Sequence, residues 1–283
     1  MTRLQAQDMA TIARDLDAYE RSLRTRTGLT LRGLACRAAG VEEHPFTCWC
    51  QNSRSAVVPL TCGQGAIAGF AESVQRILAH LGLPATVTAE PDAAGLAAAY
   101  ADHSDLVFLA DDQRFIAIDT RSREIVDNAD ATGAGFAWGL VRMAGRLDQR
   151  PVLVLGCGPV GRSAGRTVLR VGGRLSLCDL VPEASGQAAR LLSEYAPGMV
   201  SVESDLESAL ARHRLIIDAT PAADLIDEAH IHPDTFISAP GVPLGLTARA
   251  VEKISNRLLH DRLEIGVATM AAMALALRMT VRE

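Results

Sequence analysis

Lysine is almost absent from this sequence. Lys253 is the only lysine among its 28 basic residues, and the others are arginines. Enzymes that form a Schiff base, or that activate a buried amine, need a lysine in the active site. Lys253 stands in Ala-Val-Glu-Lys-Ile-Ser, a pattern typical of an exposed helix. The sequence therefore argues against lysine-dependent chemistry.

The chain also has no dense basic tract and no long apolar run. With a net charge of -5 and no basic tract, it is not expected to bind nucleic acid. The N-terminus has no apolar signal core, and the apolar run at residues 265–277 is too short to span a bilayer. We therefore expect a cytoplasmic protein with no membrane partner. A length of 283 residues suits two domains, each with its own core.

Cysteines are few and scattered. Cys48-Trp49-Cys50, with His44 before it, is the only cluster among the six. A zinc site is conceivable there, but the C-x-C spacing lacks the usual gap and no second ligand pair follows. We expect a loop without a metal. Cys157 and Cys178 stand in strand-like runs, where a small buried thiol is the simpler interpretation.

The most informative stretch is residues 151–179. An apolar run is followed by Gly156, Gly158 and Gly161, then by a helix-compatible segment and a second strand that ends at Asp179. This is the G-x-G-x-x-G pattern of a dinucleotide-binding βαβ unit. The first glycine makes a tight turn, the second admits a pyrophosphate, and the third lets helix and strand approach closely.

Asp179 ends the second strand and is followed by Leu180 rather than by an arginine. An acidic residue there accepts hydrogen bonds from the ribose hydroxyls of NAD, whereas NADP needs a cation, so NAD is preferred. Thr220 and Pro240 end later strands and should lie near the nicotinamide half. The expected cofactor-binding residues are Gly156, Gly158, Pro159, Val160, Gly161, Asp179, Thr220, Pro221, Pro240 and Gly241.

The first half of the chain has its own strand and glycine turn. A strand at residues 56–61 precedes Cys62-Gly63-Gln64-Gly65 and a helix expected at residues 66–81. Asp111 and Asp112 follow another strand. Because ligands bind at the carboxyl ends of parallel strands, either carboxylate is a candidate for substrate binding, and a solvated turn is the alternative.

These patterns predict an α/β protein in two domains. Residues 1–147 form an α/β substrate domain preceded by a long helix, and residues 148–283 form a Rossmann domain whose last helix packs back between the domains. We expect a loop at 40–55 and a linking helix at 134–147 after a polar segment at 128–133. We also expect Ser204 and Glu207 to form the capping box of a helix.

Five motifs, in order along the chain, resemble those of the PylD family of pyrrolysine synthases. They are Val57–Phe70, Leu109–Phe115 (Leu-Ala-Asp-Asp-Gln-Arg-Phe), Asp218–Pro221 (Asp-Ala-Thr-Pro), Ser238–Pro243 (Ser-Ala-Pro-Gly-Val-Pro) and Gly266–Met270 (Gly-Val-Ala-Thr-Met). The first two motifs lie outside the dinucleotide unit, so the resemblance does not reduce to a generic fingerprint.

The resemblance implies an NAD-dependent oxidation of the terminal amine of 3-methylornithyl-N6-lysine, followed by ring closure to pyrrolysine. It also implies that Asp111 is catalytic and holds a substrate amine. Leu4, Cys62, Gln64, Ile67 and Ala110 would shape the rest of the pocket. The family pattern at the turn resembles Ser-Gly-Asn-Gly, and the longer amide and weaker thiol donor of this chain would hold the substrate differently.

Two other functions remain open from the sequence. One is an NAD-dependent dehydrogenase of another amino acid or diamine, and the other is a non-catalytic NAD-sensing protein. Such a dehydrogenase would oxidise an amine other than 3-methylornithyl-N6-lysine, whereas a sensor would bind NAD but form no NADH. The sequence leaves a homodimer open.

Overall fold

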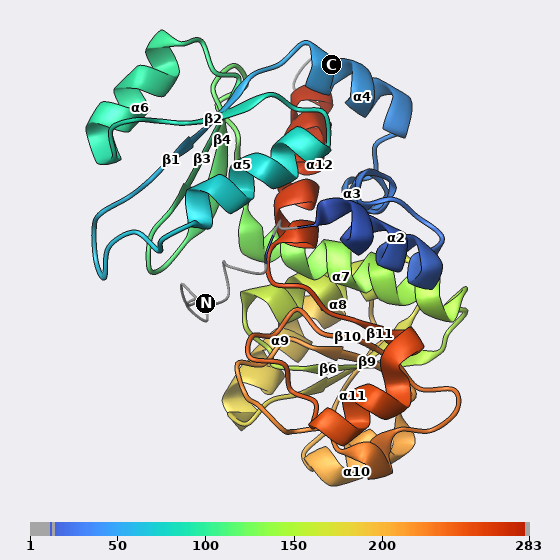
Figure 1. The fold of residues 1–283 in the computed structure, drawn as a ribbon. Coiled ribbons are helices and arrows are strands. Elements are labelled where there is room, and N and C mark those ends of the chain that lie inside the picture. The colour runs from blue at the N-terminus through green and yellow to red at the C-terminus, as the bar shows by residue number, and fades with distance from the viewer. Residues whose placement is uncertain (1–11, 13–14, 281–283) are drawn as a thin grey trace. The chain divides into compact units, whose positions relative to one another are not determined.

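The computed structural model describes residues 12 and 15–280. The chain divides into two compact units (Figure 1). Unit 1 comprises residues 1–22, 29–131 and 262–283, and unit 2 comprises residues 23–28 and 132–261. Each unit contains one sheet with parallel strands and packed helices, which confirms the expected α/β class.

The sheet of unit 1 has five strands in the order β2-β1-β3-β4-β5. β2, β1 and β3 are parallel, and β4 and β5 are antiparallel additions. The carboxyl ends of β1 and β3 therefore meet at one edge, where Val58 pairs with Leu109. The strand bounds are β1 (Ser55–Val58), β2 (Ala85–Val87), β3 (Leu106–Ala110), β4 (Phe115–Asp119) and β5 (Ile125–Asp127).

Helix α5 of unit 1 buries one apolar face, on which Val74, Ile77 and Leu78 recur at spacings of three and four. The final helix, α12, is buried on most faces and packs against α3, α5 and β4. The helices that lie wholly or partly in unit 1 are α2 (Leu16–Thr27), α3 (Leu31–Ala39), α4 (Glu43–Gln51), α5 (Phe70–His80), α6 (Asp92–Ala101), α7 (Asn128–Ala144) and α12 (Glu264–Thr280).

A buried ion pair fixes α12 to the sheet of unit 1. Arg278 donates from Nε and Nη2 to the two carboxylate oxygens of Asp119, at 2.7 and 2.8 Å. Both side chains are at most 9% exposed. A bidentate pair of this kind sets the rotation of α12 as well as its position.

The sheet of unit 2 is parallel throughout, in the order β11-β10-β9-β6-β7-β8. This is the doubly wound Rossmann order, and the strand order reverses between β6 and β9. The strands are β6 (Pro151–Leu155), β7 (Arg174–Cys178), β8 (Val200–Val202), β9 (Leu215–Asp218), β10 (Phe236–Ser238) and β11 (Leu258–Leu259).

Helices cover both faces of this sheet. Along β6, Val152 and Val154 pack in the core with α8 and α9, whereas Leu153 and Leu155 pack with α10 and α11 on the opposite face (Figure 1). Alternate residues of one strand thus belong to two cores. The bounds are α8 (Pro159–Arg170), α9 (Pro182–Tyr195), α10 (Leu206–Arg212), α11 (Ala248–Ile254) and the 3-10 helices η1 (Glu228–His230) and η2 (Ser255–Arg257).

Several local expectations were wrong. The expected loop at 40–55 contains α4, whose Pro45 falls in the first turn, where a missing amide costs little. Helix α5 begins at Phe70 rather than at residue 66. The polar segment at 128–133 is the start of α7, because Asp127 accepts the amide of Ala129. Asp205, not Ser204, caps α10 through the amide of Ser208.

The boundary expected after residue 147 differs from the division in the structure, which falls within α7 at residue 132. Ala137 and Leu140 of this helix pack in the apolar core of unit 2. The chain returns to unit 1 at Arg262, so α12 belongs by its contacts to the first sheet.

Within the described residues, no helix is both long and apolar enough to cross a membrane. The same residues contain no group of three His, Cys, Asp or Glu side chains arranged to hold a metal ion. Burial raises the pKa of Cys36, Cys50 and Cys157 to about 12, which keeps these thiols protonated.

The ion pair on α12 generates a stability prediction. Arg278→Ala leaves Asp119 buried without its cation, so we expect the free energy of unfolding to fall by about 3–5 kcal/mol. Urea denaturation of the full chain measures this. Arg76→Ala, at an exposed position of α5, is the control and should change stability little. A loss in Arg278→Ala no larger than in the control would contradict the prediction.

The same pair predicts an acid-sensitive contribution. Burial raises the pKa of Asp119, but hydrogen bonds from Arg278 and from the amides of Ser122 and Arg121 outweigh it and hold the pKa below the usual 3.8. A lowered folded pKa stabilises the fold above the unfolded pKa, and this stabilisation is lost as the pH falls through the folded value. The difference in stability between wild type and Arg278→Ala should therefore shrink below about pH 4.

Candidate functional site: a dinucleotide turn and an acidic sheet edge

The glycine turn after β6 has the geometry that a dinucleotide needs. Gly156 has a φ of +85°, and Gly158 is the N-cap of α8. A Cβ on Gly161 would lie 1.8 Å from the carbonyl oxygen of Gly156, so only glycine fits there. A Cβ on Gly158 would meet nothing within 4 Å, which leaves open space beside the backbone. The turn at Gly156 and the close approach at Gly161 thus fit the expected geometry, and the space at Gly158 is where we predict the pyrophosphate.

The first turn of α8 is suited to an anion. Pro159 and Val160 open the helix, and no side chain caps its first amides. These amides, with the positive end of the helix dipole, favour a phosphate. Arg162, which the sequence analysis did not identify, donates from Nη1 to the carbonyl oxygen of Cys157 at 3.0 Å. Its guanidinium therefore lies beside the turn.

Asp179 is fixed to the same turn. The amide of Cys157 donates to Oδ2 of Asp179 at 2.6 Å, and the amide of Val181 donates to Oδ1 at 2.9 Å. Each carboxylate oxygen retains a second lone pair for another donor. Leu180, next to it, is 98% exposed. The structure thus places a carboxylate and an exposed apolar side chain at the carboxyl end of β7.

The other expected cofactor residues meet at the ends of β9 and β10. The amide of Gly241 donates to the carbonyl oxygen of Asp218 at 3.0 Å. A Cβ on Gly241 would lie 2.2 Å from the carbonyl oxygen of Thr220. The segments with Thr220-Pro221 and Pro240-Gly241 are therefore in close contact.

Asp218 organises this contact, and the sequence analysis missed it as a functional candidate. It is fully buried, and its Oδ1 accepts the amide and the hydroxyl of Thr220 at 3.1 and 2.7 Å. Gly245 packs so closely on Oδ2 that a Cβ there would lie 2.0 Å away. Burial raises the pKa of Asp218, and the hydrogen bonds from Thr220 offset this only in part. The sequence feature that could have identified Asp218 is its position directly after the apolar run Leu215–Ile217.

In unit 1, the second glycine turn and the acidic pair come together at the carboxyl edge of β1 and β3. Gly63 and Gly65 have φ values of +64° and +81°. The amide of Gln64 donates to Oδ2 of Asp112 at 2.8 Å, and a Cβ on Gly63 would lie 2.1 Å from that oxygen. The Asp112 carboxylate thus binds the turn through the Gln64 amide and lies close to Gly63.

Asp111 is placed differently from Asp112. Its Oδ1 accepts the amides of Gln113 and Arg114, both at 2.7 Å, and these bonds hold its pKa below the usual carboxyl value. The Arg114 guanidinium is turned to Asp127, with Nη2 at 2.7 Å from Oδ2. Asp111 is therefore an exposed, ionised carboxylate, and the guanidinium of the nearby Arg114 is bound to Asp127.

All but one of the remaining expected substrate residues lie in segments that follow or end β1 and β3. Cys62, Gln64 and Ile67 lie on the β1–α5 segment, and Ala110 ends β3 immediately before Asp111. The structure brings these to the same sheet edge. Leu4 lies outside the described residues. Helix α5 starts only at Phe70, so the amides of the turn are not those of a helix terminus.

The two glycines of the dinucleotide turn give a matched prediction. Gly161→Ala forces a clash with backbone and should lower the free energy of unfolding by about 1–3 kcal/mol. Gly158→Ala has room for its methyl group and should fold with near wild-type stability, while its methyl group occupies the space expected for a pyrophosphate. Thermal denaturation without ligand measures both. Equal stability of the two variants would contradict this assignment.

The chain is similar in sequence to known proteins. Residues 8–126 match the family described as pyrrolysine biosynthesis protein PylD, N-terminal domain. Pyrrolysine synthase from Methanosarcina acetivorans is 28% identical over 95% of this chain and 98% of that protein. The pyrrolysine synthase of Methanosarcina barkeri is 26% identical over 95% and 97%.

Solved structures show the fold alone. Quinate dehydrogenase from Corynebacterium glutamicum, in complex with NAD, has a TM-score of 0.55 at 13% identity and covers 80% of this chain and 93% of its own. Shikimate dehydrogenase from Aquifex aeolicus has a TM-score of 0.54 at 16% identity, with 82% and 98% covered. The relatives align with nearly the whole chain, and the matched domain holds the acidic edge. Residues 8–126 thus match the N-terminal domain of the PylD family, and the chain is similar over 95% of its length to two pyrrolysine synthases.

Proposed function

We propose that this protein oxidises the terminal amine of 3-methylornithyl-N6-lysine with NAD and closes the product to pyrrolysine. The observation that carries the proposal is Asp111, an ionised carboxylate beside a glycine turn in a chain that also has a complete dinucleotide turn. The related pyrrolysine synthases match this chain over almost its whole length.

The residues of unit 2 fit NAD. Gly158 leaves space for the pyrophosphate, and the uncapped amides of α8 face it. Asp179 would accept hydrogen bonds from the ribose hydroxyls, because its anchoring to Cys157 and Val181 uses only part of its acceptor capacity. Thr220, Pro221, Pro240 and Gly241 would form the wall near the nicotinamide. NAD, when bound, supplies the hydride acceptor.

Asp111 would hold the ammonium group of the substrate. A carboxylate with a lowered pKa is a weak proton acceptor at neutral pH. Its role is therefore to attract and orient the amine rather than to store its proton. Cys62, Gln64, Ile67 and Ala110 would surround the aliphatic part, and Asp112 would keep the turn in place.

The reaction balances without a further oxidant. The bound ammonium group first loses a proton to water. The amine then loses a hydride from the carbon that bears it and a second proton from the nitrogen to water, which leaves an imine. The second amine of the ornithyl part attacks that carbon and ammonia leaves, which gives the ring. If the imine passes through an aldehyde, one water is taken up and later released. No lysine is needed, in keeping with a chain whose only lysine is Lys253.

Replacing Asp111 tests the substrate assignment. Asp111→Asn keeps the size of the side chain but removes the charge that pairs with the amine, so we expect turnover to fall by about a hundredfold or more. NAD affinity should be unchanged. NADH formation with the ornithyl-lysine substrate and NAD binding by calorimetry measure the two.

Asp102→Asn, an exposed acid after α6, is the matched control and should keep full activity. Retained turnover in Asp111→Asn would contradict the role of Asp111. Faster turnover with another diamine would identify a different amine substrate, and NAD binding without NADH formation on any amine would indicate a sensor.

Replacing Asp179 tests the cofactor assignment. Asp179→Asn keeps an acceptor for the Cys157 amide but removes the charge that repels a 2′-phosphate. We expect NAD affinity to fall by about tenfold or more, and the preference for NAD over NADP to narrow. Glu183→Gln, an exposed acid in the first turn of α9, is the control. An unchanged ratio of NAD to NADP affinity would show that Asp179 does not select the cofactor.

A further inference from the structure

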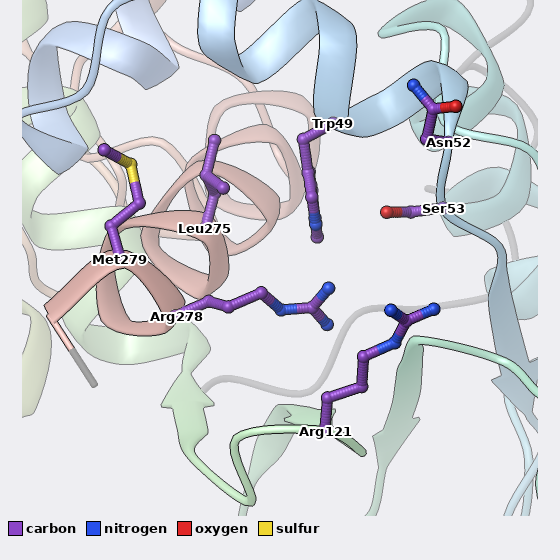
Figure 2. A pocket seen from close by; sticks show the side chains of 7 residues that line it. All are labelled: Trp49, Asn52, Ser53, Arg121, Leu275, Arg278 and Met279. Atoms are coloured by element: carbon purple, nitrogen blue, oxygen red, sulfur yellow. The ribbon is translucent and has the colours of Figure 1, made fainter. Parts of the chain in front are cut away.

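Unit 1 contains a pocket of about 180 Å³ that the proposed reaction does not use. Its lining comes from three segments: the end of α4 and the residues after it, the last turns of α12, and the β4–β5 turn (Figure 2). The lining residues are Trp49, Asn52, Ser53, Arg121, Leu275, Arg278 and Met279. We name it the Arg121 pocket.

This pocket and Asp111 lie at opposite ends of the strands of the sheet. Ser53 precedes β1 and Asp119 ends the antiparallel β4, whereas Cys62 and Asp111 follow the carboxyl ends of β1 and β3. The five residues of β3 span roughly 17 Å between the two edges. A ligand in the Arg121 pocket therefore does not occupy the site at Asp111.

Hydrogen-bond donors converge in the pocket. Figure 2 shows the guanidinium groups of Arg121 and Arg278 and the hydroxyl of Ser53 turned toward one space. Nε1 of Trp49 is shielded from solvent and has no hydrogen-bond partner among the described residues. A buried N–H without a partner destabilises the folded protein, so a hydrogen-bond acceptor beside Nε1 of Trp49 would remove this destabilisation.

The two carboxylates nearby lie behind the arginines. Asp119 uses both oxygens on Arg278, and Asp105 pairs with Nε of Arg121 and lies 3.8 Å from Nη1 of Arg278. Neither acid lines the pocket. Arg121 is 63% exposed, and the charged side chains that line the pocket are the two guanidiniums of Arg121 and Arg278.

The remaining walls are apolar. The Trp49 ring, Leu275 and Met279 line the pocket beside the guanidiniums, and the Arg278 guanidinium lies 5.5 Å from the centre of the Trp49 ring. A bare phosphate would leave these walls unused. A carboxylate with a short aliphatic or aromatic body would use the cations and the apolar surface together.

We infer that the Arg121 pocket is a second small-molecule site of this protein, which binds a small organic carboxylate. The carboxylate pairs with the exposed guanidinium of Arg121, and its apolar body packs on Trp49, Leu275 and Met279. The inference concerns binding in unit 1 alone, so it does not depend on the proposed dehydrogenase reaction.

Tryptophan fluorescence of the full chain tests it. The chain has two tryptophans, Trp49 and Trp138. Trp138→Phe makes Trp49 the only tryptophan and removes a buried indole nitrogen that has no hydrogen-bond partner in the described part of the chain. Hexanoate is the probe. Hexylamine has the same chain with the opposite charge, and inorganic phosphate has the charge without the chain.

We expect hexanoate to change Trp49 emission saturably, and hexylamine and phosphate to leave it unchanged. In the same background, Arg121→Gln should weaken hexanoate binding about tenfold. Arg123→Gln, an exposed arginine in the same turn that does not line the pocket, should bind as the parent does. Calorimetry with hexanoate measures the same affinities without relying on emission.

Three results would overturn the inference. The first is that neither method detects saturable binding up to ~10 mM hexanoate, a concentration higher than a ligand of this size should need. The second is that Arg121→Gln and the parent bind hexanoate with equal affinity. The third is that phosphate changes Trp49 emission as much as hexanoate does. Because Arg121 also pairs with the buried Asp105, thermal denaturation of Arg121→Gln is needed to show that the fold is kept.

Discussion

Each unit depends on one recurring interaction, in which a carboxylate from a neighbouring strand accepts an amide of a glycine turn. In unit 2 the Cys157 amide binds Asp179, which follows β7. In unit 1 the Gln64 amide binds Asp112, which follows β3. Glycine-rich turns are costly to order because glycine has the most conformational freedom to lose. The carboxylate offsets that cost and fixes the turn at the carboxyl edge of the sheet.

This interaction also separates the roles of neighbouring acids. Asp112 is engaged in holding its turn, whereas Asp111 caps only its own backbone and remains an exposed anion. Asp218 performs a third role, because it is fully buried and joins the Thr220 and Gly241 segments. These carboxylates thus differ in their roles, and the pKa values of Asp111 and Asp218 are shifted in opposite directions.

The dinucleotide unit was predictable because its determinants are local. The apolar run, the spacing of Gly156, Gly158 and Gly161, and the acidic end of the second strand all lie within 29 residues. Elements with weak local signals were missed. Helix α4 contains a proline and three polar residues in its first half, and β5 is only three residues long. Their formation depends on packing in unit 1 rather than on their own sequence.

The sequence by itself determined the α/β class, the glycine turn after the first strand of unit 2 and the resemblance to the PylD family, and it singled out the Asp111-Asp112 pair as a candidate site. Spacing and hydrophobic pattern suffice for these, because they concern residues close together in the chain. Only the tertiary structure decided which acid holds the glycine turn, that Asp218 joins two segments, and that Arg278 meets Asp119 across 159 positions. Those contacts join residues far apart in the chain, and the packing of strands and helices, not the local pattern, brings them within hydrogen-bond distance.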